Sequence, residues 1–173
     1  MIRSASAATA AEHRATRRTP LGTVTLTVAG GRLARVELGD VDEAVDSSTG
    51  RSDAMEIAQE ALDRYLAGAG AEVPRELLDL SGTTDFQRRV FDALLGVRWG
   101  VLVTYGELAG RIGRAGAARA VGGAVGSNPL PLFVPCHRVV AAGRRLGGFG
   151  AGLDWKRRLL RHEGWTIEED RIL

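Results

Sequence analysis

Residues 103–126 read VTYGELAGRIGRAGAARAVGGAVG, and this stretch determines how the second half of the chain folds. Thr104, followed three residues later by Glu107, predicts a capping box at the start of a short helix. A glycine-containing turn follows at 113–116, and a second helix is predicted over 117–126. Two helices joined by such a turn are typical of a helix-turn-helix motif, a pattern that many other helical hairpins share.

The second predicted helix consists almost entirely of small residues. It holds four alanines, and each of Gly122, Gly123 and Gly126 would cost about 1 kcal/mol in an exposed helix interior. A backbone this bare suits close approach to another surface, either a neighbouring helix or a nucleic acid. The helix lacks the long side chains that read base edges in the major groove, so a nucleic acid would be met through the minor groove. Arg119 is its one long side chain.

The sequence PCHRVV at 135–140 carries Cys136, the single cysteine of the chain. A lone thiol can form neither an internal disulfide nor a thiolate zinc cluster. It can act as a nucleophile, because a neighbouring imidazole such as that of His137 activates a thiol. Taken alone, a cysteine between Val134 and Val139 is more typical of a small buried hydrophobic residue.

Composition limits the class of protein. A length of 173 residues with 45% hydrophobic and 25% charged residues is ordinary for one globular domain or two small ones. No run of 18 apolar residues predicts a membrane span, and the N-terminus lacks the apolar core of a secretory signal. With one unpaired thiol and no export signal, we expect a cytoplasmic location.

Charge is distributed unevenly along the chain. Residues 86–161 hold 13 basic and 3 acidic side chains, a local charge of +10, whereas residues 1–80 carry a net charge of −4. A coding bias would explain the preference for arginine over lysine, but not the scarcity of acidic residues. The second half is therefore expected to meet a polyanion.

The first half is predicted to be a small α/β unit. Alternating valines and threonines over 21–38, with a turn at 29–31, predict a β-hairpin. A loop is expected over 39–52, and then a helix that Asp53 caps and that runs to residue 67. A third strand is expected around 77–80.

Three regions are predicted along the chain. Residues 1–19 form a disordered tail, with an amphipathic transit sequence as the alternative, residues 20–80 an N-terminal α/β domain, and residues 81–173 a C-terminal domain. The C-terminal domain begins with a helix that Thr84 or Asp85 caps and that ends near Gly96.

From about Thr84 to Trp165 the chain resembles the O6-alkylguanine-DNA alkyltransferases, also called methylated-DNA–protein-cysteine methyltransferases. The motifs that carry the resemblance are, in order, YGELA at 105–109, AARAVG at 117–122, NP at 128–129, PCHRV at 135–139 and HEG at 162–164. Five motifs in the expected order and spacing are highly specific. The resemblance implies an α+β fold, with a small N-terminal ribonuclease-H-like α/β unit and a C-terminal helical winged helix-turn-helix domain.

The resemblance also implies a chemistry, the direct repair of DNA. An alkyl group on guanine O6, or on thymine O4, passes to Cys136 and remains there, so that each molecule acts once. His137 takes the thiol proton through a bridging water, and Glu163 orients and stabilises the imidazole. Tyr105 donates a proton toward the departing guanine. Asn128 is the hinge between the recognition helix and the active-site loop.

The implied partner is double-stranded DNA, bound through the minor groove by a monomer, with no membrane partner and no cofactor. Some family members bind zinc through N-terminal cysteines and histidines, but because Cys136 is the only cysteine of this chain we predict no metal. The target nucleotide has to leave the stacked duplex, and Arg119 would fill the space. The implied DNA-binding residues are Thr104, Ala118, Arg119, Ala120, Gly122 and Gly123, and the implied pocket residues are Pro131, Val139, Phe149, Gly150 and Ala151.

Three positions depart from the family pattern. Phe149 stands where many members carry tyrosine, and Gly150 where many carry serine or another polar residue able to hydrogen-bond O6. Gly126 replaces a basic residue that contacts phosphate in some members. The first two departures bear on the preference of the pocket, and the third on affinity for DNA.

Two other functions fit part of the sequence. A Cys-His-Glu hydrolase of esters or amides would turn over many times, but it leaves the small-residue helix and the basic half unexplained. A non-catalytic protein that binds alkylated DNA would not need Cys136. A regulatory role through a second methyl-accepting cysteine is excluded, because the N-terminal half has none.

Overall fold

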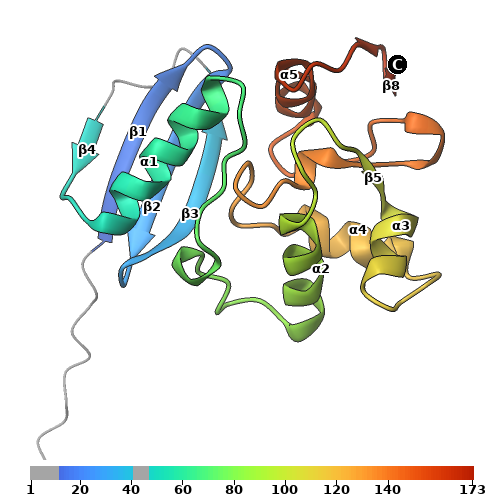
Figure 1. The fold of residues 1–173 in the computed structure, drawn as a ribbon, viewed down its shortest axis with the longest axis horizontal. Coiled ribbons are helices and arrows are strands. Elements are labelled where there is room, and N and C mark those ends of the chain that lie inside the picture. The colour runs from blue at the N-terminus through green and yellow to red at the C-terminus, as the bar shows by residue number, and fades with distance from the viewer. Residues whose placement is uncertain (1–11, 41–46) are drawn as a thin grey trace, which may run out of the picture.

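The N-terminal half of the computed structural model is an antiparallel sheet with one helix packed across it (Figure 1). The structure describes residues 12–40 and 47–173. The strand order is β3-β2-β1-β4. The strands are β1 (Glu12–Thr19), β2 (Gly22–Ala29), β3 (Arg32–Gly39) and β4 (Ser47–Thr49).

The predicted hairpin is confirmed, and β2 is its central strand. β2 pairs with β3 through partners such as Leu26↔Val36, with a register shift between Thr27 and Val28. Every residue of β2 except the last is buried. The hairpin thus supplies the apolar face on which the N-terminal helix packs.

The disordered tail predicted for residues 1–19 is wrong over residues 12–19, which form β1. This strand pairs with β2 from Glu12↔Ala29 to Thr19↔Gly22, and residues 1–11 lie outside the described residues. Only Ala15 and Thr19 of β1 are buried, so the strand shows almost no hydrophobic alternation. It forms because its backbone pairs with the buried strand β2 along its whole length.

Helix α1 (Asp53–Leu66) follows β4, which lies in the stretch expected to be a loop. The side chain of Ser52, not Asp53, caps the helix by accepting a hydrogen bond from the backbone of Met55. The third strand expected near 77–80 is reduced to a single bridge, Leu33↔Leu78, after the short 3₁₀ turn η2 (Arg75–Leu77).

The C-terminal half is mainly helical. The capping box predicted for Thr104 with Glu107 is present, and Thr84 forms a second one with Gln87. No helix in residues 12–40 and 47–173 is long and apolar enough to cross a membrane. The ribonuclease-H-like and winged helix-turn-helix descriptions stay predictions. The elements are α2 (Asp85–Leu95), β5 (Val103–Thr104), α3 (Tyr105–Arg111), α4 (Ala118–Gly126), η3 (Cys136–Arg138), β6 (Val139–Val140), η4 (Ala142–Arg144), α5 (Leu153–His162), β7 (Ile167–Glu168) and β8 (Arg171–Ile172).

One hydrophobic core joins the two halves of the chain. Buried side chains of the sheet and of α1 lie in the same cluster as those of α2, α3, α4 and α5. Hydrogen bonds also cross the junction: Val36 N donates to Pro129 O at 3.0 Å, and Trp155 Nε1 donates to Gly39 O at 3.2 Å. Strand β3 is therefore attached directly to the segment that leads from α4 to the thiol.

Candidate active site

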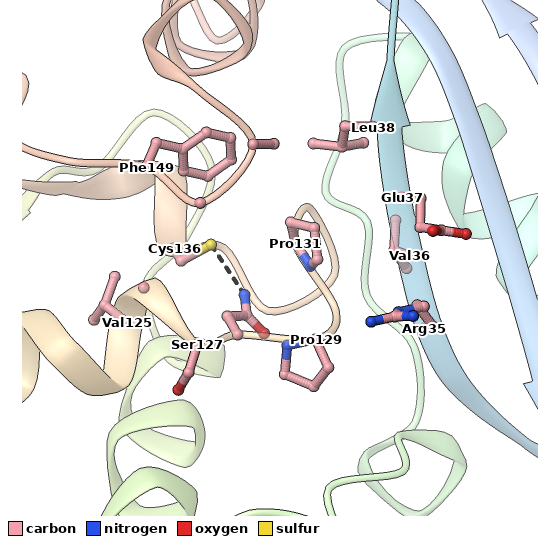
Figure 2. A pocket seen from close by; sticks show the side chains of 14 residues that line it. Arg35, Val36, Glu37, Leu38, Val125, Ser127, Pro129, Pro131, Cys136 and Phe149 are labelled. Carbon is pink, nitrogen blue, oxygen red and sulfur yellow. Dashed lines mark hydrogen bonds between the residues drawn. The ribbon is translucent and has the colours of Figure 1, made fainter.

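Cys136 begins the 3₁₀ turn η3, at the end of a loop that leaves α4. Its backbone N–H donates to Val134 O at 2.7 Å, and Pro135 between them has φ −77° and ψ 62°. This is an inverse γ-turn, which proline favours because its ring fixes φ near this value. The turn directs the sulfur into a cavity, between Phe149 and Pro131 (Figure 2).

Asn128 connects the end of α4 to the thiol loop. Its Nδ2 donates to Cys136 Sγ at 3.0 Å and to Val134 O at 2.8 Å, and its Oδ1 accepts from Leu130 N at 3.0 Å. One amide group thus holds the loop at three points and fixes the sulfur. Asn128 therefore links the end of α4 to Cys136, and its role as a hinge stays a prediction.

The Cys136 thiol is 3% exposed. Burial raises its pKa to about 11, although the hydrogen bond from Asn128 and the charge of Lys156 both act to lower the pKa. The resting group at neutral pH is therefore the thiol, which is a far weaker nucleophile than the thiolate. A base has to take its proton for the sulfur to react.

His137 is the next residue, and its ring is fully buried. Nε2 lies 2.7 Å from Glu163 Oε1, while Nδ1 has no hydrogen-bond partner among the described residues. Burial lowers the pKa of His137 and outweighs the opposite effect of Glu163, so the ring is neutral at pH 7. Because a carboxylate only accepts hydrogen bonds, the proton is on Nε2 and Nδ1 is free to act as a base.

Glu163 is the C-cap residue of α5 and the centre of a buried network. Besides the His137 ring it binds Arg138, whose Nη2 lies 2.8 Å from Oε1 and whose Nε lies 3.0 Å from Oε2. Tyr65 Oη donates to Oε1 at 3.1 Å, and Gly100 N donates to Oε2 at 3.1 Å. Burial alone would raise the pKa of Glu163, but His137 and Arg138 lower it to about 2.

Sequence reasoning missed three members of this site. Arg138 belongs to the PCHRVV motif at 135–140. A charged residue within this otherwise apolar stretch indicates that its side chain is buried and paired with an opposite charge. Lys156 is the only lysine in an arginine-rich chain and is fully buried. Its Nζ donates to the carbonyls of Val139, Leu146 and Gly148, which fixes the backbone before Phe149. Tyr65 gave no signal, because it lies 98 residues from Glu163.

The cavity beside the sulfur has a volume of about 410 Å³ and lies between the two halves of the chain (Figure 2). Four of the expected pocket residues line it: Pro131, Phe149, Gly150 and Ala151. Val139 does not line it, because its side chain is buried in β6 beside Val103 and its N–H donates to Cys136 O. The lining also includes residues of β3, namely Arg35, Val36, Glu37 and Leu38, and residues 125–129 at the end of α4 and just after it.

Two departures from the family pattern lie against each other. A Cβ atom on Gly150 would lie 3.2 Å from Gly126 O, and both residues line the cavity. The backbones of the pocket wall and of α4 are therefore nearly in contact at this point. A serine at residue 150 would require one of them to move.

Tyr105 begins α3 and lies at the edge of the thiol region. Its hydroxyl donates to Gly148 O at 3.5 Å, and burial raises its pKa, so it remains a proton donor at neutral pH. Its ring packs on α4, because a Cβ on Gly122 would lie 3.8 Å from two ring carbons. The close approach expected of the small-residue helix is thus, at Gly122, an approach to a neighbouring helix.

The opposite face of α4 is open. Arg119, Ala120 and Gly123 are exposed and Ala118 is half-buried. No atom lies within 4 Å of a Cβ placed on Gly123. Thr104 is also half-buried, and its hydroxyl is bonded to Glu107 in the capping box. In the described part of the chain, no group of three or more His, Cys, Asp or Glu side chains is placed to hold a metal ion.

Comparison with known proteins relates the chain to the same family that the sequence motifs resemble. Residues 85–165 match the family model for the DNA-binding domain of 6-O-methylguanine DNA methyltransferase. A Mycobacterium bovis protein named methylated-DNA–protein-cysteine methyltransferase is 42% identical over 165 residues, which cover 93% of this chain and 98% of that protein.

Solved structures show the same similarity. The crystal structure of Mycobacterium tuberculosis O6-methylguanine methyltransferase has a TM-score of 0.73 and 39% identity, over 88% of this chain and 93% of that one. The structure of Mycobacterium tuberculosis OGT in complex with DNA has a TM-score of 0.71 and 41% identity, over 86% of this chain and 90% of that one.

The buried Glu163 network predicts a dependence of stability on pH. The folded-state pKa of Glu163, about 2, lies below its ordinary value of 4.5. Its contribution, about 3 kcal/mol, is therefore complete above pH 4.5 and is lost as the pH falls to 2. In Glu163→Gln, Arg138 loses its buried partner, so we expect a loss of about 3–5 kcal/mol at neutral pH. Urea unfolding from neutral to acid pH measures both effects, and the two stability curves should converge near pH 2. Glu168→Gln, which changes an exposed carboxylate, is the control, and an equally stable Glu163→Gln at pH 7 contradicts the prediction.

Proposed function

The chain belongs to the family of methylated-DNA–protein-cysteine methyltransferases, and on this basis we propose that it repairs DNA by moving an alkyl group from guanine O6 to Cys136. One observation carries the proposal. The sulfur lies on the wall of a cavity, next in the chain to a buried imidazole that is hydrogen-bonded to a buried carboxylate. This is the order of nucleophile, base and orienting group that nucleophilic catalysis requires.

The transfer is a single displacement. The sulfur attacks the alkyl carbon, a carbon–sulfur bond forms, and the carbon–oxygen bond to O6 breaks. The bonding electron pair stays on the guanine, which becomes neutral by accepting a proton. The thiol proton passes to His137 Nδ1 through a water molecule, and Glu163 stabilises the resulting imidazolium.

The high pKa of Cys136 makes this proton transfer essential. A thiol with a pKa of about 11 supplies very little thiolate at neutral pH, so the proton has to leave as the sulfur attacks. His137 is suited to receive it, because its Nδ1 is unprotonated and its other nitrogen is held by Glu163. Tyr105 is the proton donor for the departing base, since burial keeps its hydroxyl protonated.

The product explains why each molecule acts once. A thioether has no proton to lose and is a poor leaving group, so nothing in the site regenerates the thiol. The protein is therefore consumed in proportion to the lesions it repairs. A Cys-His-Glu hydrolase would instead release its acyl group to water and turn over many times.

The open face of α4 supports the proposed mode of DNA binding. Its small residues allow the backbone to enter a minor groove, and the basic C-terminal half provides the attraction to phosphate. The target nucleotide rotates out of the duplex into the cavity beside Cys136, and Arg119 occupies the space that it leaves. One protein molecule suffices for this mode of binding, so the protein acts as a monomer. O4-alkylthymine is a second substrate, because it presents the same type of alkylated oxygen.

The proposed function is tested by counting transferred groups. Duplex DNA that contains O6-methylguanine with a labelled methyl group is incubated with increasing amounts of protein, and label on the protein is measured. We expect a plateau of one label per protein molecule, and no label on Cys136→Ser, because the sulfur is the acceptor. Continued turnover would favour the hydrolase, and binding without any label would favour a non-catalytic DNA-binding protein.

Replacement of Arg119 tests the extrusion of the base. Arg119→Ala should slow repair of duplex DNA about tenfold or more, because the cost of unstacking is no longer offset. Reaction with free O6-benzylguanine should change less than about twofold, because a free base needs no extrusion. Arg64→Ala, on α1 in the other half, removes the same charge and is the control. Equal losses on both substrates would contradict the role of Arg119.

A further inference from the structure

We propose that Tyr65, which belongs to the N-terminal half, is a positioning residue for the Cys136–His137–Glu163 relay. The inference rests on the proposed function, and it assigns to the N-terminal half a part in the chemistry. Tyr65 is the next-to-last residue of α1 and is fully buried. It touches neither the sulfur nor the base, so it would act through Glu163.

The hydroxyl of Tyr65 is hydrogen-bonded to the same carboxylate oxygen of Glu163 as the imidazole of His137. Tyr65 Oη donates to Glu163 Oε1 at 3.1 Å, and His137 Nε2 lies 2.7 Å from that oxygen. Arg138 Nη2 also reaches Oε1, whereas Gly100 N and Arg138 Nε reach Oε2. Oε1 therefore carries the contacts that decide how strongly the carboxylate attracts the proton on the ring.

The ring of Tyr65 is held so tightly that its hydroxyl has a fixed direction. It packs against Trp99 at 4.9 Å between ring centres, against His162 at 5.2 Å, and edge-on against His137 at 6.3 Å. His162 Nε2 also lies 2.8 Å from the backbone oxygen of Tyr65. A phenylalanine would fill the same space, so the packing does not require the hydroxyl.

A buried hydroxyl needs a partner, and here the partner is charged. Burial and the nearby Glu163 raise the pKa of Tyr65 well above its ordinary value, so the group donates its proton to the hydrogen bond and keeps it. Hydrogen bonds to a charged group are stronger than those between neutral groups. The bond thus ties α1 to α5 at the residue that orients the imidazole.

Several charged or titratable groups lie around the Cys136–His137–Glu163 relay and influence the pKa values of His137 and Cys136. Arg138 and Glu163 face the imidazole directly, Lys156 acts on both His137 and Cys136, and His162 lies against the ring of Tyr65. Beyond the sulfur, Tyr105 is a further titratable group, and Arg35 and Glu37 line the cavity.

Removal of the Tyr65 hydroxyl leaves more negative charge on Oε1. The carboxylate then attracts the imidazolium more strongly, so the pKa of His137 rises. His137 acts as a base only while Nδ1 is unprotonated, and a higher pKa moves the onset of activity to higher pH. Loss of the bond also frees the carboxylate to turn, which misplaces the imidazole and lowers the maximal rate.

The test is the single-turnover rate of Tyr65→Phe with free O6-benzylguanine, measured from about pH 5 to about pH 9. We expect the acid limb of the profile to move up by about half a pH unit and the plateau rate to fall by about three- to tenfold. Affinity for unmodified duplex DNA should not change, because Tyr65 lies in the buried core.

Two controls separate positioning from a general loosening of the junction between the halves. Arg158→Ala removes hydrogen bonds from α5 to Leu21 and Asp40 without touching Glu163, so its pH profile should match that of the wild type. In the Glu163→Gln background, Tyr65→Phe should have no further effect on the profile, because the orienting group is already lost.

The outcomes distinguish this inference from the proposed function. A wild-type protein that takes up one alkyl group, together with a Tyr65→Phe variant of unchanged rate and profile, overturns the role of Tyr65 alone. A slower variant with an unshifted acid limb, or a Tyr65→Phe effect that persists in Glu163→Gln, would make Tyr65 merely structural. A wild-type protein that accepts no alkyl group overturns the proposed function itself.

Discussion

The carboxylate of Glu163 is held in the interior by donors from three segments of the chain: α1, the turn before β5, and η3, which contributes two successive residues. A buried carboxylate is costly unless it is paired and fully hydrogen-bonded, and here Arg138 and His137 provide the compensation. The same contacts fix the tautomer of His137 and join the two halves of the chain. The position of the His137 imidazole therefore depends on the same contacts that stabilise the fold.

The burial that raises the pKa of Cys136 also limits its chemistry. The protonated thiol of a residue that is only 3% exposed reacts slowly with electrophiles in solution, which suits the single use that the proposed function assigns to this sulfur. Asn128 and Lys156 fix the elements around it, one in the segment after α4 and the other at the wall of the cavity. Reaction then requires a substrate in the cavity and a base in place.

Local patterns predicted local structure well. The helix cap at Thr84, the capping box at Thr104 and the hairpin formed by β2 and β3 follow from short-range rules, and the structure has all of them. The structure also brings Cys136, His137 and Glu163 into one region, as the resemblance implied. The roles of these residues remain part of the proposed function.

Features that depend on distant partners were not predicted. β1 has almost no hydrophobic alternation, and it forms because its backbone pairs with that of β2. In the sequence, Tyr65 fits the apolar face of an amphipathic helix like its neighbours. The hydrogen bond from its hydroxyl to Glu163 is apparent only in the folded chain. The burial of Lys156 is likewise a result of packing, because its three carbonyl partners are spread over β6 and the residues between β6 and α5.

The central claim is that the neutral ring of His137 carries its proton on Nε2 and leaves Nδ1 free. Nitrogen-15 NMR of histidine-labelled protein tests this directly, with the resonances of the three histidines assigned by single replacements. At neutral pH the account predicts a protonated Nε2 and an unprotonated Nδ1 for His137. A proton on Nδ1, or a ring that is charged at neutral pH, would contradict it.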